Sequence, residues 1–509
     1  MKRGGLFEWA EDSENSLEIQ PMKRLSQKEA GAYYTPDGVV ASLLKWAVRH
    51  ADERLLDPSC GDGRFIAGHL NSVGIEQDFV AAREAIDRAP WALVHEGDFF
   101  VWAKSTHERF ECAAGNPPFI RYQTFKGETR ERALSLCREL GADFNGLASS
   151  WAPFLVAAAS LLKPGGRMAF VVPAEIGHAP YAAPLLEYLI TNFSLVHIVA
   201  FRDKLFPELS EDCWLLYAED FGSSTTSIRF SPLNKFRPLS QPPKQFLNIP
   251  VEEWRQEWKR RLRPFLLSAA ARDLYRQVRS LPGTCRFGDL ASVGIGYVSG
   301  ANDFFHLRPS VAGHLGIPDG LLRPAVRNGR ALPQRELTSE TVRNWYKADE
   351  PMLLLHLPKG TELPTAVKRY LASEPARVAR QAYKCRMRDP WYSVPDVQVP
   401  DFFLSYMSGR EPSLVRNAAG CTCTNSVHSV RLRQKGVIRR LQGTWESPFV
   451  RLSCELEGHP LGGGMLKLEV REAGQIVLPC ETGLQQLDET VIQEGLSVMR
   501  EWGHYAAGA

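Results

Sequence analysis

Asn116-Pro117-Pro118-Phe119 is the stretch of this chain whose residue types could do the most specific chemistry. Two consecutive prolines fix their own backbone and keep the preceding residue out of the helical region. The Asn116 amide oxygen and the neighbouring backbone carbonyl are therefore presented on a stiff loop, as two acceptors suited to an amino group. The Phe119 ring offers a face on which a planar ring can stack. This pattern predicts a site that holds a nucleobase or amide nitrogen during a reaction. The alternative is an ordinary surface turn.

Three polar stretches precede this loop, each at the end of an expected strand. Asp57-Pro58-Ser59-Cys60-Gly61-Asp62-Gly63 is a turn whose glycines let the backbone approach a ligand. Glu76 ends the next strand, where a carboxylate can accept both hydroxyls of a ribose. Asp98-Phe99 follows the third strand and suits the amino group and ring of an adenine. Ile66 stands where the dinucleotide fingerprint needs a glycine, which disfavours a nicotinamide cofactor.

The elements that must position these residues are those of an α/β sheet, because short apolar runs alternate with helical patterns. We expect a helix that starts with Thr35 as its cap and Pro36 as its first residue. Another helix is expected from about residue 150 to residue 162, ending in a turn at Lys163-Pro164-Gly165-Gly166. Strands are expected at 54–56, 73–75, 93–95, 112–114, 168–172 and 195–200. Parallel strands carry their ligand sites at their carboxyl ends.

The bulk composition is that of a globular protein with more than one domain. The chain has 509 residues, of which 44% are hydrophobic and 23% charged. Its start lacks the apolar core of a secretory signal, and its longest apolar run, Trp151 to Leu162, is too short for a membrane span. The ten cysteines form no CxxC pair. We therefore expect a cytoplasmic protein with reduced thiols and no metal site.

The charge is distributed unevenly, although the net charge is only +3. Residues 1–250 carry 26 Lys and Arg against 31 Asp and Glu, whereas residues 251–440 carry 31 against 17, a net of +14. Such a segment indicates a phosphate-binding surface, with a solvated charged face as the alternative. Five prolines in residues 231–250 predict a linker. The expected organisation is an amino-terminal extension (1–30), a catalytic domain (31–230), this linker and a basic recognition domain (251–509).

In their order, these motifs resemble the gamma-class adenine-N6 DNA methyltransferases of type II restriction-modification systems, which use S-adenosylmethionine. The amino-terminal motif of that family matches residues 31–36, and its later motifs match the four stretches described above. Phe154 matches an aromatic that packs on the cofactor adenine, and Phe206 matches one that sandwiches the target base. Residues 293–305 and 462–468 look like segments of the family's recognition domain.

The resemblance implies a Rossmann-like class I S-adenosylmethionine-dependent domain, followed by an α+β DNA-recognition domain. The implied reaction is methyl transfer to N6 of an adenine flipped out of double-stranded DNA. A monomer is expected, with a separate cognate restriction endonuclease that acts on the same site. Catalysis is assigned to Asn116, Pro117, Pro118 and Phe119, and stacking on the target base to Phe119 and Phe206. The implied cofactor contacts are Thr35, Asp57, Pro58, Cys60, Gly61, Gly63, Glu76, Asp98, Phe99, Asn116 and Phe154.

The basic half of the chain is expected to hold the DNA. Most of its cations should meet phosphates, which fix position without reading sequence, and a few should reach base edges. The candidate DNA contacts are Arg263, Arg327, Arg330, Lys384, Arg386, Arg388, Arg431 and Arg433.

Other functions compete with this interpretation. Asn-Pro-Pro-aromatic motifs also serve RNA and protein-glutamine methyltransferases, and ribosomal-RNA guanine enzymes favour the phenylalanine. Enzymes that methylate N4 of cytosine usually carry Ser at the position of Asn116. A non-catalytic DNA-binding subunit would not be expected to keep Asp57, Glu76 and Asp98. A fused endonuclease is not expected, because the sequence has no credible Asp…Glu-x-Lys cluster and no spare domain to hold one.

Overall fold

The computed structural model describes residues 35–505, except 147, 210, 410, 462–463 and 486. Three sequence predictions therefore lie wholly or partly outside the described residues. They are the amino-terminal extension at 1–30, residues 31–34 of the amino-terminal motif, and Gly462 and Gly463 of the late recognition segment.

A nine-stranded sheet forms the first half of the chain, in the order β3-β2-β1-β4-β5-β7-β6-β8-β9. Strands β1 to β5 run parallel to one another, and β7 runs antiparallel between β5 and β6. This arrangement confirms the expected Rossmann-like class I domain. The strands are β1 (Leu55–Asp57), β2 (Ser72–Glu76), β3 (Leu93–Glu96), β4 (Phe110–Gly115), β5 (Leu162–Pro173), β6 (Phe193–Phe201), β7 (Cys213–Phe221), β8 (Ser227–Leu233) and β9 (Leu247–Pro250).

Helices cover both faces of this sheet, because successive strand residues point to opposite sides. Ala113 and Met168 belong to the core beneath α6, whereas Ala114 and Ala169 belong to the core beneath α2. The helices are α2 (Asp37–Ala47), α3 (Phe79–Arg88), α4 (Phe99–Ser105), α5 (Gly127–Glu139), α6 (Trp151–Ser160) and α7 (Ala183–Asn192).

Two local predictions are wrong. Pro36, not Thr35, is the N-cap of α2, because Pro36 has an extended ψ of 140° and the helix begins at Asp37 with no side-chain cap. The Lys163–Gly166 segment does not separate α6 from the next strand as a free turn. Strand β5 already begins at Leu162, and the extra residues are absorbed by an irregularity in its pairing with β4.

The second half is an α+β arrangement of smaller sheets, with strand orders β11-β20-β16-β18-β14, β12-β15-β13-β19, β17-β22-β21 and β10-β23. Its strands are β10 (Cys285–Arg286), β11 (Ala291–Ile295), β12 (His306–Leu307), β13 (Leu322–Val326), β14 (Glu336–Leu337), β15 (Leu353–Leu355), β16 (Phe402–Ser405), β17 (Met407–Ser408), β18 (Leu414–Asn417), β19 (Thr422–Cys423), β20 (Val427–Leu432), β21 (His459–Leu461), β22 (Met465–Lys467) and β23 (Val477–Leu478). Its helices are α8 (Ala269–Ser280), α9 (Phe287–Leu290), α10 (Asn302–Phe305), α11 (Pro309–Leu315), α12 (Ser339–Lys347), α13 (Thr365–Leu371), α14 (Glu374–Gln381), α15 (Tyr383–Arg386), α16 (Ile438–Trp445), α17 (Pro448–Glu457), α18 (Val470–Ala473), α19 (Glu481–Gln485) and α20 (Glu489–Trp502).

The end of the chain packs on the first half. Helices α17 and α20 contribute Phe449 and Met499 to the same core as the large sheet. Trp502 meets Trp214 edge to face, with ring centroids 6.4 Å apart. The predicted linker, residues 231–250, contains the end of β8 and all of β9, which pairs with β8. The proposed domain boundaries stay a prediction.

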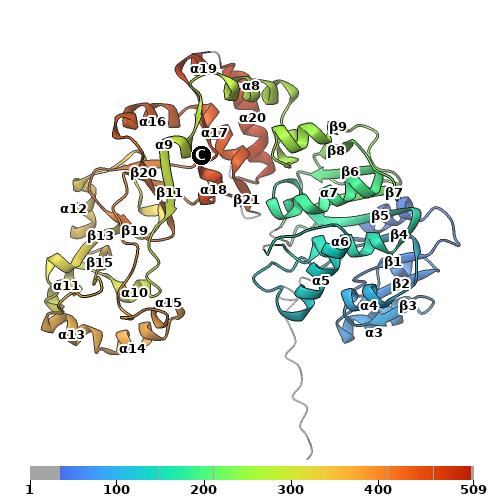
Figure 1. The fold of residues 1–509 in the computed structure, drawn as a ribbon, viewed down its shortest axis with the longest axis horizontal. Coiled ribbons are helices and arrows are strands. Elements are labelled where there is room, and N and C mark those ends of the chain that lie inside the picture. The colour runs from blue at the N-terminus through green and yellow to red at the C-terminus, as the bar shows by residue number, and fades with distance from the viewer. Residues whose placement is uncertain are drawn as a thin grey trace, which may run out of the picture.

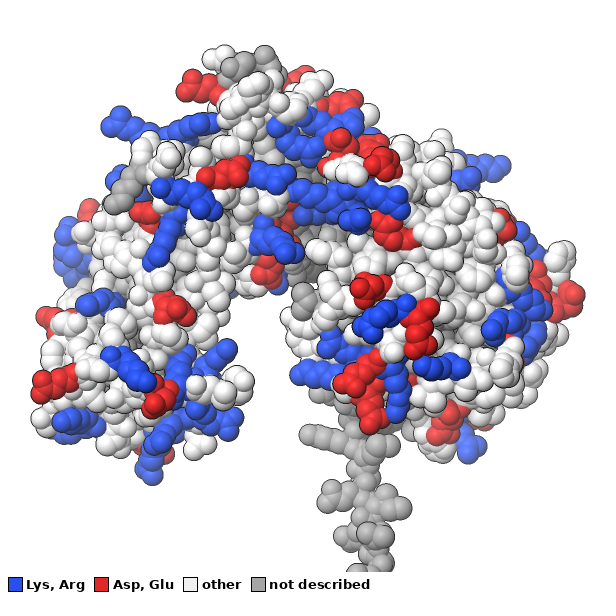
Figure 2. Space-filling view, viewed as in Figure 1, with Lys and Arg blue, Asp and Glu red and all other residues white. Residues whose placement is uncertain are grey.

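The molecule consists of two lobes joined by a bridge that contains α8, α17 and α20 (Figure 1). The first lobe carries the large sheet, and the second carries β12, β13, β15 and α10–α15. The space between the lobes is hollowed, and Lys and Arg side chains gather at the tip of the second lobe beside it (Figure 2). Helix α15 lies on the side of this tip that faces the first lobe (Figure 1).

Candidate functional site

Four of the polar residues predicted from sequence lie at one edge of the large sheet. Asp57 and Glu76 are the last residues of β1 and β2, while Asp98 and Asn116 closely follow β3 and β4. These strands are neighbours in the order β3-β2-β1-β4, and all run in parallel. Their carboxyl ends therefore form one continuous row of polar groups.

The Gly-rich turn after β1 is held tightly on one side and open on the other. Gly61 and Gly63 have φ values of +54° and +85°, which a residue with a side chain adopts at a cost. A Cβ on Gly63 would lie 2.8 Å from the Cα of Ala85 in α3, whereas a Cβ on Gly61 would meet no atom within 4 Å. Cys60 is buried beneath Gly74. The backbone at Gly61 is thus the part of the turn that a ligand can approach.

Carboxylates at this edge create a strongly acidic environment. The pKa of Asp57 is raised to about 8, chiefly by burial, against the Ser59 amide, which donates to Asp57 at 3.2 Å, and with smaller contributions from the charges of Glu76 and Asp62. Burial also raises the pKa of Glu76, against hydrogen bonds from the amides of Asp78 and Gly61 at 2.8 and 2.9 Å. A cationic ligand would relieve this repulsion.

The Asn116–Phe119 loop is fastened to the start of α6 by Ser150. The Ser150 hydroxyl donates to the Pro118 carbonyl and accepts from the Ile120 amide at 2.9 Å. The Ser150 amide donates to the Ile120 carbonyl at 3.0 Å. Sequence reasoning missed Ser150, because this residue was only the expected start of a helix and its partner Ile120 lies 30 residues away.

Gly115 lets Asp57 and the Asn116–Phe119 loop approach each other. A Cβ on Gly115 would lie 2.6 Å from the Asp57 Oδ1 atom. The Ser59 hydroxyl also lies 3.5 Å from the carbonyl oxygen of Asn116. The Gly-rich turn and the Asn-Pro-Pro-Phe loop therefore form one contiguous surface, with Pro58 and Pro117 buried beneath it.

The predicted adenine-contacting residues already interact with one another. Phe99 and Phe154 stack with centroids 5.3 Å apart and an interplanar angle of 16°. Phe99 is buried and Phe154 is half-buried. Asp98 caps α4 by accepting from the Phe100 amide at 2.8 Å, and its other oxygen accepts from the Thr129 hydroxyl at 3.0 Å.

The two aromatic residues predicted to stack on the target base lie against the same core. Phe119 is half-buried and packs on the cluster that contains Phe206. Phe206 itself is only 1% exposed. It is a core residue in this structure, so a stacking role requires the 205–207 segment to open. That role stays a prediction.

Thr35 lies beside the Gly-rich turn, although it does not cap α2. Its carbonyl accepts from the Arg64 guanidinium at 3.3 Å. Arg64 follows Gly63 directly and also pairs with Asp62, with a nitrogen–oxygen distance of 3.1 Å. The start of α2 is thereby tied to the turn, and the predicted cofactor contact of Thr35 stays a prediction.

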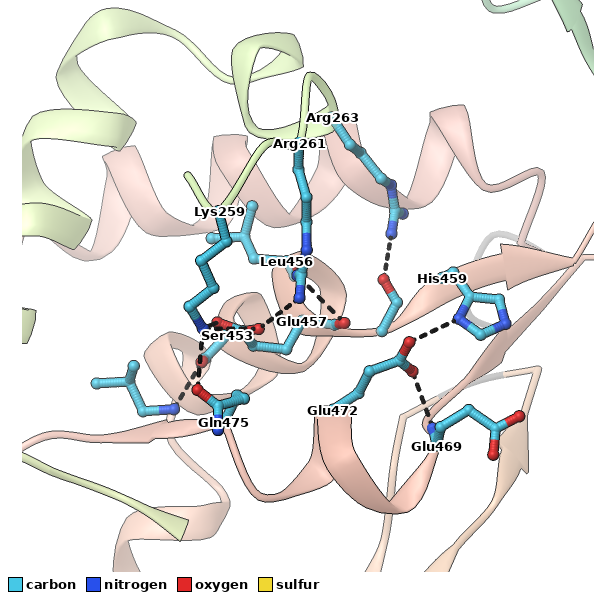
Figure 3. A network of polar contacts seen from close by, with 12 residues as sticks. Lys259, Arg261, Arg263, Ser453, Leu456, Glu457, His459, Glu469, Glu472 and Gln475 are labelled. Carbon is cyan, nitrogen blue, oxygen red and sulfur yellow. Dashed lines mark hydrogen bonds and ion pairs between the residues drawn. The ribbon is translucent and has the colours of Figure 1, made fainter. Parts of the chain in front are cut away.

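Arg263 is buried in this structure, and its predicted contact with DNA stays a prediction. Its side chain is 3% exposed, and it donates to the Glu455 and Gly458 carbonyls at 2.7 and 3.2 Å. Figure 3 shows Lys259, Arg261 and Arg263 directed onto the end of α17. Lys259 and Arg261 both reach the Glu457 carboxylate at 3.1 Å. These three cations therefore join the segment 259–263 to the carboxyl-terminal helix α17.

The other predicted DNA contacts divide into two groups. Arg327 pairs with Asp303 at 3.0 Å, Arg388 donates to the carbonyls of Val298 and Ser299, and Arg433 donates to the Gly288 carbonyl at 3.1 Å. Four are exposed, with no described carboxylate within 4.0 Å: Arg330, Lys384, Arg386 and Arg431.

The carboxyl edge of the sheet adjoins the bridge between the lobes. The Leu262 amide donates to the Gly177 carbonyl, just beyond the end of β5, at 2.7 Å. The rings of His178 and His459 stack nearby, with centroids 5.8 Å apart. Burial and the charges of His459, Arg263 and Arg261 hold the pKa of His178 well below its usual value. The candidate site therefore lies at the junction of the two halves.

Two absences hold for the described residues alone. No group of three or more His, Cys, Asp and Glu side chains there is arranged to bind a metal ion. No helix in the same part of the chain has the length and apolar character needed to cross a membrane.

Comparison with known proteins gives matches in both halves. The model for the Eco57I restriction-modification methylase matches residues 67–206, and the model for the C-terminal domain of type II methyltransferase M.Eco57I matches residues 259–501. The chain is 25% identical to type II methyltransferase M.XamI of Xanthomonas campestris pv. amaranthicola, covering 88% of this chain and 85% of that protein. It is 21% identical to M.AccI of Acinetobacter calcoaceticus, covering 96% and 92%. A solved structure of the type IIG restriction endonuclease BpuSI aligns with 16% identity and a TM-score of 0.42, covering 92% of this chain and 61% of that one.

Proposed function

We propose that this chain, which belongs to the type II restriction-modification methyltransferase family, is a gamma-class enzyme that methylates N6 of adenine in duplex DNA. The observation that carries the proposal is the row of Asp57, Glu76, Asp98 and Asn116 at four adjacent strand ends. Three acids followed by a paired-acceptor loop suit a cationic nucleoside cofactor beside an amino group.

The acidic edge fits S-adenosylmethionine, whose sulfonium and ammonium groups are positive. The open backbone at Gly61 supports close approach of this ligand, and Glu76 keeps free lone pairs for ribose hydroxyls. Phe154 would pack beside the adenine ring. When bound, the cofactor would supply an electrophilic methyl group. Transfer of that group to N6 would break its bond to sulfur and release one N6 proton to water.

Asn116 and Pro117 would activate the amino group. The N6 lone pair is delocalised into the adenine ring, which makes N6 a poor nucleophile. Hydrogen bonds from N6 to the Asn116 side-chain oxygen and the Pro117 carbonyl would localise that lone pair on nitrogen. Because the nitrogen becomes positive as the methyl arrives, these acceptors favour the transition state over the ground state. No strong general base is needed.

The substrate we propose is double-stranded DNA, with the target adenine flipped out of the helix. A stacked base cannot reach a pocket of this kind, and its extrusion costs a few kcal/mol. Phe119 would recover part of that cost by stacking on the base. The hollow between the lobes, beside basic side chains, suits a polyanion (Figure 2). The two relatives that align with most of this chain carry type II methyltransferase names, which favours DNA over RNA or protein.

Base-resolved sequencing of DNA from cells that express the chain tests this function. The expected result is N6-methyladenine at one short sequence motif. The matched control is Asn116→Ala, which should still bind S-adenosylmethionine in calorimetry and unfold at an unchanged temperature, yet leave no modified adenine. Methylated RNA or protein glutamine in the absence of modified DNA would overturn the proposal. A separate endonuclease that cleaves the same motif is the partner we expect.

A further inference from the structure

A short exposed turn at the tip of the second lobe combines two large apolar side chains with two cations, and the Lys384 ammonium lies 5.9 Å from the centroid of the Tyr383 ring. Tyr383 and Met387 are 63% and 69% exposed. Lys384 and Arg386 lie between them in sequence, are exposed, and have no described carboxylate within 4.0 Å. Single exposed apolar residues are ordinary, but two of this size within five residues of a strongly cationic turn are not explained by packing.

The segment that leads into the turn is strongly basic, although Asp389, directly after it, lies 3.9 Å from Lys359. Residues 365–388 contain a single acidic residue, Glu374, which pairs with Arg377. Seven cations stand in the same segment: Lys368, Arg369, Arg377, Arg380, Lys384, Arg386 and Arg388. A protein partner or a second copy of this chain would have to bury these charges, whereas nucleic acid phosphates would neutralise them.

The turn is rigidly held from beneath. Cys385 is fully buried, and its Sγ atom lies 3.7 Å from the Ser299 carbonyl oxygen. Gly300 makes this approach possible, because a Cβ there would lie 2.9 Å from the Cβ of Lys384. Arg388 donates to the carbonyls of Val298 and Ser299. The exposed side chains are thus presented on a fixed support, which lowers the entropy lost on binding.

We propose that Tyr383 and Met387 insert at a base step of the bound duplex, while Lys384 and Arg386 hold the flanking phosphates. Proteins that kink DNA use apolar wedges flanked by cations in this way, and the unstacking is offset by the wider contact that the bent DNA makes. Helix α15 faces the first lobe across the hollow, where the duplex would lie (Figure 1). This inference rests on the proposed function and adds a second contact that deforms the DNA.

The test compares variants of the full chain on a short duplex that carries the methylated motif, with fluorophores at its two ends. Tyr383→Ala should weaken binding about 10- to 100-fold, the range expected for one lost contact between a base and an aromatic ring, and Met387→Ala should weaken it as well. In complexes with these two variants, the end-to-end distance of the duplex should lengthen toward that of free DNA, while the dependence of affinity on salt stays unchanged. Lys384→Ala and Arg386→Ala should instead each reduce the salt slope by about 1.

Tyr346→Ala is the matched control, because Tyr346 is 55% exposed on α12, on the far side of the same lobe (Figure 1). It should bind and bend DNA like the unaltered protein. Unchanged affinity or an unchanged end-to-end distance in Tyr383→Ala and Met387→Ala would overturn the wedge. If the unaltered chain itself neither binds nor methylates duplex DNA, the proposed function fails instead. Both side chains are exposed, so the variants should fold, which their unfolding temperatures will verify.

Discussion

Ile120 and Ser150 exchange two hydrogen bonds across 30 residues of sequence. The Ile120 amide donates to the Ser150 hydroxyl at 2.9 Å, and the Ser150 amide donates to the Ile120 carbonyl at 3.0 Å. Together with the bond from the Ser150 hydroxyl to Pro118, they fix the loop that carries Asn116 to the first turn of α6. The proposed acceptors are therefore positioned by a residue that would not touch the substrate.

Ser150→Ala should slow methylation with little effect on cofactor binding. The loop would lose both side-chain hydrogen bonds, and small displacements of positioning groups can cost up to about 100-fold in rate. We expect kcat to fall about 10-fold, while the Kd for S-adenosylmethionine changes much less. Ser160→Ala is the control, since Ser160 lies on the same helix and bonds only to the Ala157 carbonyl. An equal fall in kcat in the Ser150→Ala and Ser160→Ala variants would argue against positioning of the loop by Ser150.

Asp57→Asn should stabilise the ligand-free protein and prevent cofactor binding. The folded-state pKa of Asp57, about 8, is raised above its ordinary value of 3.8. Ionisation therefore opposes folding, and the stability of the unaltered protein is lost progressively as pH rises from about 4 to about 8. The free energy of unfolding gained by Asp57→Asn should grow across this window and level off above it. Because a buried group without adequate partners costs at least about 1–3 kcal/mol, we expect Asp57→Asn to gain at least that much free energy of unfolding at the top of this pH window.

Thermal unfolding at several pH values and calorimetry with S-adenosylmethionine check this outcome. Asp52→Asn serves as the control, because Asp52 is exposed. A stability gain independent of pH, or undiminished cofactor affinity, would contradict the role given to Asp57.

Arg263→Ala should unfold the protein more easily rather than weaken its hold on DNA specifically. Burial raises the pKa of Glu455 and Arg263 lowers it, with a nitrogen–oxygen distance of 3.4 Å between the two side chains. Removing one member of a buried pair costs about 3–5 kcal/mol, because the other charge stays buried. Combining Arg263→Met with Glu455→Gln should restore part of this loss.

Arg386→Ala provides the contrast, because Arg386 is exposed and lies in the cationic tip. The free energy of unfolding of the Arg386→Ala protein should change by less than about 0.5 kcal/mol, while its affinity for DNA falls. Chemical denaturation and DNA titration on the same samples separate the two effects. A folded, fully stable Arg263→Ala with weak DNA binding would restore the sequence-based assignment.

Local patterns in the sequence were sufficient for much of the sheet. The runs ending near Asp57, Glu76 and Asn116 predict parallel strands, and their carboxyl ends meet as expected. Contacts between segments far apart in the sequence could not be predicted, because they depend on tertiary packing rather than on the local spacing of residues. Arg263 looks like any surface cation in its basic cluster, and only the fold shows that α17 buries it.

Phe206 illustrates the same limit for the candidate site. Its motif indicates a ring beside the target base, whereas the structure places it within the core on which Phe119 packs. The sequence contains no signal for this burial, because the packing partners come from α2 and from strands far along the chain. Ser150 was missed for a related reason, since its partners Pro118 and Ile120 become its neighbours only in the folded chain.

Gly61→Ala and Gly63→Ala should separate cofactor binding from folding. Both positions have positive φ, so each alanine carries a backbone penalty of about 1 kcal/mol. At Gly63 the added Cβ also meets the Ala85 backbone at 2.8 Å, so α3 must shift and the unfolding temperature should fall markedly. At Gly61 the Cβ points into open space that we assign to the cofactor, so the fold should survive while the Kd for S-adenosylmethionine rises at least about 10-fold. Calorimetry beside thermal unfolding distinguishes the two, and a Gly61→Ala variant that binds the cofactor normally would place the ligand elsewhere.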